Sequence, residues 1–394
     1  MTKTDPNNFT PWQESCSALV KSHLQLPSIE GLSGELEYDV AIIGGGIAGL
    51  SALDAIAQSG MKAALFDGHP NLGLGASGKN AGIFCAGINM PITYTPKGSP
   101  AAALWSATHH MLLAILEEAA QPESMLYARR VGALALATSP TAGKRLVQET
   151  RARNQAAMSA EMINAKDLDK ITQGFLDVST VHSAMFLPDE GTIHPLTLLA
   201  TVANRVRKNG GELYGAAPIG QIKKAHDGWI LSSQFGIKIK CRALISAIGP
   251  ILNPTGRIFA LSFRYEPPAG CPVWWDANPY IYYDYRPGNG FLTVSGGRYG
   301  APQTDKADRK YHVKMAQAAR KWVPDFACLE PSHAWAVDLN VSPDMLPEIT
   351  ELGENHLSIH GLGALGVLPG IVLGRQAGDR TVTKLRSEKA NSRS

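Results

Sequence analysis

Residues 38–67 constrain the fold of this chain more than any other stretch. A short apolar run, residues 40–43, leads into the glycine-rich sequence GGGIAG at residues 44–49. The residues that follow have the apolar spacing of one helix face, at Ile47, Leu50, Leu53 and Ile56. A second apolar run, residues 63–66, then ends in an acidic residue, Asp67. This order predicts a strand, a tight turn, a helix and a second strand, which is the βαβ unit that binds dinucleotides.

Each glycine of the turn has a physical reason to be there. Gly44 permits the tight turn, Gly46 lets a pyrophosphate approach the backbone, and Gly49 lets the helix pack closely on the strand. The backbone amides at the start of the helix, from Ile47 and Ala48, are expected to receive the phosphate charge together with the helix dipole.

Asp67 adds the acidic end of the unit. Its carboxylate can accept hydrogen bonds from a ribose diol, which favours an adenine dinucleotide without a 2′-phosphate over NADP. A bare Gly-x-Gly-x-x-Gly string also occurs in glycine-rich hairpin turns. The dinucleotide prediction therefore depends on the strand, the helix, the second strand and the acidic residue following one another at the expected spacing.

The composition narrows the class of protein. The 394 residues are enough for two or three domains, and 44% hydrophobic with 18% charged residues is typical of a compact soluble protein. The net charge of +3, without a basic block, indicates no nucleic-acid partner. The five cysteines are scattered without a CxxC pair, so we expect reduced thiols and no metal site.

Nothing in the sequence resembles a membrane or export signal. The amino terminus lacks an apolar core of signal-peptide length, and no uninterrupted apolar run reaches about 18 residues. We therefore expect a cytoplasmic protein without a transmembrane segment. Peripheral membrane attachment stays open, since distant segments can assemble an amphipathic surface.

A second glycine-rich stretch, GASGKNAGIF, occupies residues 75–84. Ser77, Lys79 and Asn80 alternate with its glycines, which suits backbone and hydroxyl contacts to a bound polyanion. A mobile surface loop fits the same residues equally well.

GGGIAG followed by GASGKNAG resembles the DAO family, the FAD-dependent proteins related to D-amino-acid oxidase, glycine oxidase and sarcosine oxidase. In that family the second motif wraps the cofactor, so the resemblance implies FAD. The leading segment, with Pro11 and Trp12 and then Gly31 and Gly34 before the first strand, is most similar to the gamma-glutamylputrescine oxidase-like branch.

The resemblance covers about residues 37–380 and implies an α/β fold. An FAD-binding, Rossmann-like domain carries an inserted α+β substrate domain, which is built on a large, mostly antiparallel sheet. We expect an N-terminal extension over 1–36, an FAD-binding domain made of 37–90, 185–252 and 328–394, and a substrate domain made of 91–184 and 253–327.

A further strand end resembles a cofactor-facing segment of the family. The strand at 243–248 ends at Ala247, Ile248 and Gly249, which in similar flavoproteins lies against the cofactor. A plain core strand that ends in a turn is the alternative.

The C-terminal part contains a glycine turn at residues 361–366, followed by a helix whose amino end points at the flavin in the family. The residues we assign to the cofactor there are Gly363, Leu365 and Gly366. Amides at a helix start stabilise the negative charge of a reduced flavin. Many relatives have histidine or lysine at the position of Leu365, and Thr350 replaces a common glycine. The electrostatic tuning of the flavin and its reactivity with oxygen therefore stay open.

The substrate candidates come from an aromatic hairpin at 272–298. It contains Tyr280, Tyr282, Tyr283 and Tyr285, and it resembles the substrate-domain sheet that roofs the flavin. Arg298 stands where relatives place polar or cationic groups, and its planar guanidinium can bind a carboxylate through two hydrogen bonds. An arginine exposed at a strand end is an equal alternative. We choose Arg298 and Tyr283 as substrate-pocket residues, and we leave His109 and His110 unassigned as partly exposed helical histidines.

The resemblance implies oxidation of a C–N bond in an amine or amino acid by hydride transfer to FAD, with hydrolysis of the imine to a carbonyl product. The electron acceptor is oxygen or a quinone. The alternatives are a flavin-binding subunit or scaffold that acts only with a partner chain, and an NAD-dependent dehydrogenase, which the later motifs argue against. We expect FAD to be held without a covalent bond, although Cys85 follows the second motif closely. Homo- and hetero-oligomers both stay open.

Overall fold

The stretch at 38–67 forms the predicted unit. Strand β1 (Glu35–Ile43) leads through the glycine turn into helix α3 (Ile47–Gln58), and β2 (Ala63–Phe66) returns parallel to β1. The second half of β1 and all of β2 are buried, as their apolar runs require.

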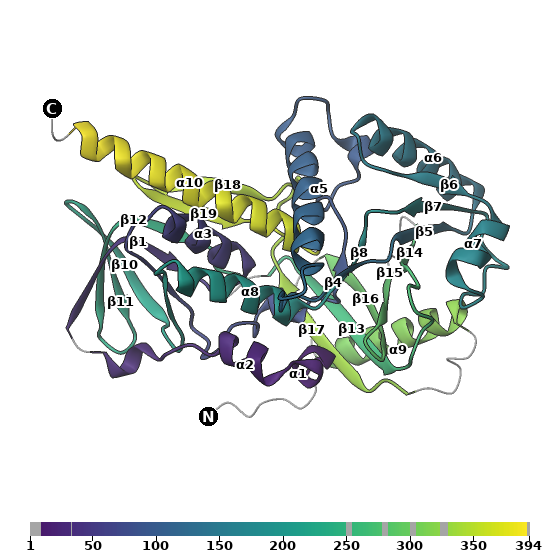
Figure 1. The fold of residues 1–394 in the computed structure, drawn as a ribbon, viewed down its shortest axis with the longest axis horizontal. Coiled ribbons are helices and arrows are strands. Elements are labelled where there is room, and N and C mark those ends of the chain that lie inside the picture. The colour runs from purple at the N-terminus through teal and green to yellow at the C-terminus, as the bar shows by residue number, and fades with distance from the viewer. Residues whose placement is uncertain are drawn as a thin grey trace. The chain divides into compact units, whose positions relative to one another are not determined.

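The computed structural model describes residues 9–32, 34–249, 254–277, 283–299, 305–323 and 330–391. The chain divides into two units, and Figure 1 labels the helices and strands of both. The first unit consists of Met1–Ser15, Lys79–His194 and Asn253–Leu339. The second unit consists of Cys16–Gly78, Pro195–Leu252 and Asn340–Ser394.

The second unit is built on a sheet with the strand order β10-β11-β12-β1-β2-β9. The strands other than β1 and β2 are β9 (Glu212–Tyr214), β10 (Ile219–Ala225), β11 (Gly228–Ser233), β12 (Lys238–Ser246), β18 (Glu348–Gly353) and β19 (His356–His360). β12, β1, β2 and β9 are parallel, and β19 extends the parallel part beside the end of β12. β10, β11 and β18 pair with their neighbours in antiparallel fashion.

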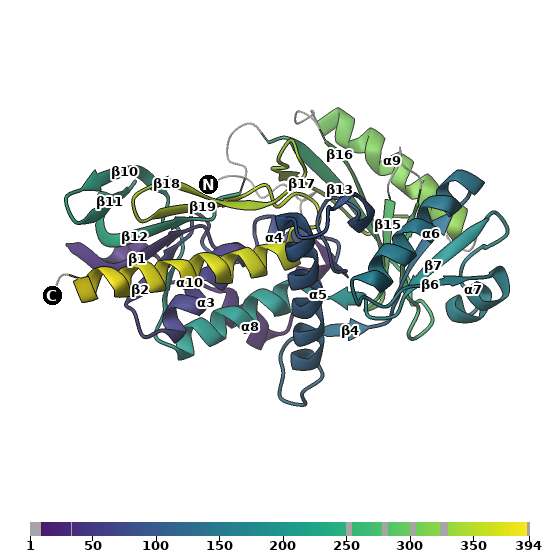
Figure 2. The ribbon, with the colours of Figure 1, turned by 90° about the horizontal axis from the view of Figure 1, so that it is seen from above.

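Helices of the second unit pack closely on one another. They are α2 (Ala18–Leu24), α3, α8 (Pro195–Lys208) and α10 (Val367–Asn391). Helix α3 lies between α8 and α10, as Figures 1 and 2 both show. A Cβ atom on Gly374 of α10 would lie 2.3 Å from the carbonyl oxygen of Ala48 in α3. Only glycine therefore allows α10 to approach α3 this closely.

The first unit contains a large mixed sheet and a small one. The large sheet has the order β17-β13-β16-β15-β14-β5-β7-β6, antiparallel throughout except for β14 beside β5. Its strands are β5 (Ala133–Ala137), β6 (Glu161–Ile163), β7 (Ser183–Leu187), β13 (Gly256–Arg264), β14 (Val273–Asp276), β15 (Tyr283–Gly288), β16 (Phe291–Tyr299) and β17 (His333–Leu339). The small sheet is made of β3 (Ile83–Phe84), β4 (Ala128–Arg130) and β8 (Gly191–Ile193). The predicted α/β class with a large, mostly antiparallel second sheet is confirmed.

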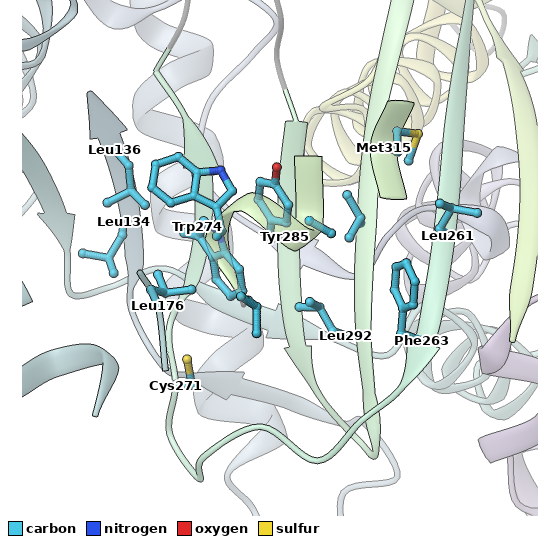
Figure 3. Close-up of a cluster of buried hydrophobic side chains, with 14 of the residues drawn as sticks. Leu134, Leu136, Leu176, Leu261, Phe263, Cys271, Trp274, Tyr285, Leu292 and Met315 are labelled. Atoms are coloured by element: carbon cyan, nitrogen blue, oxygen red, sulfur yellow. The ribbon is translucent and has the colours of Figure 1, made fainter. Parts of the chain in front are cut away.

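Helices cover the large sheet, and its core lies beneath α9. The remaining helices are α1 (Pro11–Ser15), α4 (Ala76–Lys79), α5 (Pro100–Ala119), α6 (Pro140–Gln155), α7 (Ala165–Thr172) and α9 (Asp305–Trp322), with short 3-10 turns at Ile29–Gly31 and Ile92–Tyr94. Figure 3 shows the buried cluster on this side, with Trp274 and Tyr285 from neighbouring strands and Met315 from α9. The two aromatic rings stack with centroids 5.0 Å apart.

Three further details concern the extension, β4 and β5, and the aromatic hairpin. The N-terminal extension contains two short helices, and Trp12 is fully buried. Gly132 lies between β4 and β5 and adopts a φ of +78°, which separates the two strands. Tyr280 and Tyr282 lie outside the residues that the structure describes.

Candidate functional site

Three parallel strands of the second unit end side by side at one edge of its sheet. β1, β2 and β12 are parallel and end in register, and the next residues are Gly44, Asp67 and Ala247. The amide of Ala247 donates to the carbonyl of Ile43 at 2.8 Å, which holds two of these segments together. The carboxyl edge of a parallel sheet is where α/β proteins bind their ligands.

The first glycine turn is too tight for side chains. Gly44 has a φ of +107°, and a Cβ atom there would lie 2.4 Å from the carbonyl oxygen of Ala247. A Cβ atom on Gly49 would lie 2.0 Å from the carbonyl oxygen of Gly44. At Gly46, by contrast, the nearest atom to an added Cβ is the Ser77 hydroxyl oxygen at 3.2 Å. Gly44 and Gly49 thus set the shape of the turn, and a Cβ atom at Gly46 would press on the Ser77 hydroxyl.

Asp67 lies at the end of β2 with its carboxylate turned toward the turn. The carboxylate accepts hydrogen bonds from the amide of Gly45 and, at 2.7 Å, from the amide of His69. Burial raises the pKa of Asp67, but the hydrogen bonds from His69 and Gly45 outweigh it, and the pKa is lowered overall. The ionised carboxylate is therefore fixed beside the turn, where it can accept hydrogen bonds from hydroxyl groups.

Two helix amino ends meet at this edge. Gly370 of α10 packs against Ile47 and Ala48, the first residues of α3, and Gly374 packs one turn further along both helices. The two helices therefore run parallel, with their N-termini at the same end. Each N-terminus has amides without partners inside the helix and about half a positive charge. The Ser77 hydroxyl accepts the amide of Ile47 at 2.9 Å. This arrangement suits a diphosphate.

The C-terminal glycine turn connects β19 to α10. Gly363 has a φ of +61°, and its amide donates to the carbonyl of Asn340 at 2.9 Å. The carbonyl of Gly366 accepts the amide of Gly370 at 3.0 Å, which starts α10. Leu365 is half-buried. Gly363, Leu365 and Gly366 thus lie at the N-terminus of α10, while Gly249 lies exposed beyond β12.

Lys79 and Asn80 of the second motif belong to the first unit. Both are half-buried, and burial lowers the pKa of Lys79. The Asn80 side-chain oxygen accepts the amide of Gly82 at 2.9 Å and so closes a turn within the motif.

The two substrate candidates lie on neighbouring strands. Tyr283, on β15, is half-buried against the cluster beneath α9, and burial raises its pKa. Arg298, on β16, pairs through its backbone with Arg257 of β13, and its side chain lies outside what the structure describes. Both assignments stay predictions.

Residues on the opposite face of β15 were missed in the sequence. Arg286 alternates with Tyr285 along the strand, and its Nε atom lies 3.4 Å from the carbonyl oxygen of Gly82 in the second motif. Asp284 lies on the same face as Arg286 by strand periodicity. The alternation in YDYR, residues 283–286, was the available signal, because it separates two aromatic from two charged residues.

A buried charged cluster lies behind Cys85. Glu190 is 2% exposed and accepts hydrogen bonds from the Ala86 amide at 2.7 Å and from Arg153 at 3.2 Å. Burial raises the pKa of Glu190 to about 7, although Arg153 opposes this. Burial and the Glu190 charge also raise the pKa of Cys85, so its thiol is protonated at neutral pH. A protonated thiol is a poor nucleophile.

Among the residues that the structure describes, no group of three histidine, cysteine, aspartate or glutamate side chains could hold a metal ion. Within the same residues, no helix has both the length and the apolar character needed to cross a membrane.

Comparison with known proteins agrees with this geometry. The family model that matches residues 39–380 is DAO, described as FAD dependent oxidoreductase. A curated relative described as a probable oxidoreductase, OrdL of Rhizobium meliloti (strain 1021), is 25% identical over 360 residues, which is 86% of this chain and 81% of that protein.

Solved structures share the fold. Glycine oxidase from Geobacillus kaustophilus superposes with a TM-score of 0.72 at 19% identity, over 88% of this chain and 95% of the other. L-proline dehydrogenase from P. horikoshii superposes with a TM-score of 0.71 at 15% identity, over 88% and 93%. At these identities the likeness shows the fold alone.

Proposed function

The chain belongs to the DAO family of FAD-dependent oxidoreductases, and from this premise we propose that it oxidises the C–N bond of an amine or amino acid. The observation that carries the proposal is the meeting of the glycine turn, Asp67 and two helix N-termini at one sheet edge. The two structural relatives named above are a glycine oxidase and a proline dehydrogenase, so each is named for an amino acid.

The residues at this edge fit FAD. The backbone of the glycine turn and the amide ends of α3 and α10 would receive the diphosphate, and Asp67 would bind the ribose hydroxyls. Gly363, Leu365 and Gly366, at the start of α10, would face the flavin. The protonated thiol of Cys85 supports a cofactor held without a covalent bond.

In the proposed reaction the substrate amine is neutral, and the carbon beside it loses a hydride. As the hydride leaves, the nitrogen lone pair forms the C=N bond of an iminium ion, which loses a proton to water and becomes the imine. Water then adds to the imine carbon, and the nitrogen leaves as ammonia or an amine, which gives a carbonyl product. Bound FAD would supply the acceptor for the hydride, with oxygen or a quinone as the final electron acceptor. The protein has to orient the substrate, exclude water and hold the cofactor.

Substrate recognition is proposed for the first unit. Arg298 would bind a substrate carboxylate through its planar guanidinium, and Tyr283 would line the pocket. An enzyme that uses Arg298 in this way would prefer amino acids to simple amines. The domain division proposed for these roles is an FAD-binding domain at 37–90, 185–252 and 328–394, and a substrate domain at 91–184 and 253–327.

Anaerobic flavin reduction tests the proposal. The purified protein is mixed without oxygen with a panel of amines and amino acids, and the visible flavin absorption is followed. We expect at least one substrate to bleach the absorption and to yield a carbonyl product. Dithionite serves as the control that the bound flavin can be reduced.

The outcomes separate the candidates. Bleaching by dithionite but by no member of a broad panel would contradict the proposed oxidation, and it would favour a flavin-binding subunit that needs a partner chain. Recovery of the colour in air would identify an oxidase. Recovery with a quinone but not with air would identify a dehydrogenase.

A further inference from the structure

Buried side chains of the first unit hold the loop of the second motif, residues 79–82, through hydrogen bonds to the backbone carbonyl groups of the loop. The indole N–H of Trp335, in β17, donates to the carbonyl of Lys79 at 2.7 Å. The indole N–H of Trp12, in α1, donates to the carbonyl of Asn80 at 2.9 Å. Both tryptophans are almost fully buried, at 1% and 0% exposed. Two consecutive carbonyls of a cofactor motif are thus bonded to buried side chains that lie far away in sequence.

A buried arginine supports the same loop two residues further on, at Gly82. The guanidinium of Arg286 is fully buried and lies over the Trp12 ring, 4.8 Å from its centroid. Its Nε atom lies 3.4 Å from the carbonyl oxygen of Gly82, which also accepts the amide of Ile193 at 2.9 Å. Burial lowers the pKa of Arg286 to about 10, so the side chain keeps its charge at neutral pH.

Gly82 sits directly on these two side chains. It has a φ of +77°, and a Cβ atom there would lie 3.0 Å from both the Arg286 Nε atom and the Trp12 ring. The hydrogen bond from the Gly82 amide to the Asn80 side chain closes the loop against them. The loop therefore rests on a surface shaped by Trp12 and Arg286.

The short helix α1 is fixed independently of the loop. Glu14, two residues after Trp12, pairs with Arg264 at 2.7 Å and with His333 at 3.2 Å, on β13 and β17. The same strands that form the large sheet therefore hold the segment that presents Trp12. The N-terminal extension is therefore anchored to the large sheet at the point where it contacts the loop.

In a trans peptide the carbonyl and the next amide point in opposite directions, so a carbonyl held inside turns the following amide outward. We propose that Trp12 and Trp335, with Arg286 beneath them, are positioning residues that fix the 79–82 loop for FAD. This inference rests on the proposed contact between that loop and FAD. It gives the N-terminal extension the role of supporting the second motif, although the extension carries no cofactor motif.

The test compares three tryptophan variants. Trp12→Phe and Trp335→Phe replace the indole by a smaller phenyl ring and remove the N–H that holds the loop. Trp105→Phe is the matched control, because Trp105 is 3% exposed in the same unit and its indole donates at 3.0 Å to Met90, outside the loop. FAD is removed from each protein, and FAD binding is titrated by quenching of flavin fluorescence. Thermal unfolding of the FAD-free proteins measures the general loss of stability.

We expect Trp12→Phe and Trp335→Phe to raise the Kd for FAD by roughly tenfold each, which corresponds to about 1.4 kcal/mol. We also expect both to change the visible circular dichroism of the FAD-saturated protein, which a loss of stability alone would leave unchanged. Trp105→Phe should lower the thermal midpoint similarly but keep the Kd. Equal FAD affinity in all three variants, or an equal loss in all three, would overturn the proposal. The readout needs no substrate, so a failure of C–N oxidation leaves it interpretable.

Discussion

Replacement of Gly44 by alanine isolates the energy of the tight first turn. Gly60, at the end of α3, provides the matched control in the same βαβ unit. Both glycines have positive φ, +107° at Gly44 and +78° at Gly60. A Cβ atom on Gly60 meets nothing within 4 Å, whereas one on Gly44 lies 2.4 Å from the carbonyl oxygen of Ala247. The two variants share the backbone strain and differ in the contact.

The expected magnitudes follow from these two terms. An alanine in the left-handed region costs about 1–2 kcal/mol, which is all that Gly60→Ala should lose. Gly44→Ala should add about 1–3 kcal/mol for overpacking against Ala247, for a total of about 2–5 kcal/mol. Because the contact pushes β12 away from the turn, Gly44→Ala should also weaken FAD binding by more than tenfold.

Chemical denaturation of the FAD-free proteins and FAD titration measure the two effects. Gly60→Ala should show a small loss of stability and an unchanged Kd for FAD. Gly44→Ala should show a larger loss of stability and a raised Kd. The reasoning is refuted if the two variants unfold at the same denaturant concentration, or if Gly44→Ala binds FAD as tightly as Gly60→Ala.

Three further predictions concern titrating groups. Asp67→Asn should raise the Kd for FAD about tenfold. Since folding lowers the pKa of Asp67 below 3.8, its stabilisation is present above that pH and is lost on acidification, so acid unfolding curves of wild type and variant should converge at low pH. Folding raises the pKa of Glu190 from 4.5 to about 7, so the thermal midpoint of the wild type should fall as the pH rises from 4.5 to 7. Glu190→Gln leaves Arg153 unchanged, and this variant should show a smaller fall in thermal midpoint over the same pH range. Acid precipitation should leave all FAD in the supernatant, equally for wild type and Cys85→Ser; a yellow pellet from wild type alone would contradict the protonated thiol.

The sequence was most informative where the physical cause is local. The turn at 44–49 needs glycine for reasons that a few neighbouring residues set, and the βαβ unit formed where the apolar runs placed it. Helix α8 likewise begins at Pro195, the first-turn position at which proline is favoured. The resemblance to the family extended this local information to the whole fold.

The substrate-pocket residues were harder to predict. The alternation of side chains along a strand separates its two faces, but it does not tell which face a helix covers. The pocket assignment of Tyr283 stays a prediction, and in β15 the face with Tyr283 and Tyr285 packs on the side of α9. The covering helix decides this, and its position depends on contacts distant in sequence. The other face, with Asp284 and Arg286, was therefore not assigned.

The tryptophan contacts with the second motif show the same limit. Trp12 and Trp335 bond to residues 68 and 256 positions away, so no local pattern links the donors to the loop. The partner of the Trp12 indole N–H could therefore not be derived from the sequence.

The parallel contact between α3 and α10 has a consequence for the order of events during synthesis. Helix α3 is made before α10, and roughly 300 residues separate the two helices. Helix α10 covers α3 through its glycine residues. At about 5–20 residues per second, a ribosome takes about 15–60 seconds to make that interval. During that time β1, the glycine turn and α3 have been synthesised, but α10 has not. The nascent chain therefore has to protect the uncovered apolar surface of α3 until α10 is made, and only then can it retain the cofactor.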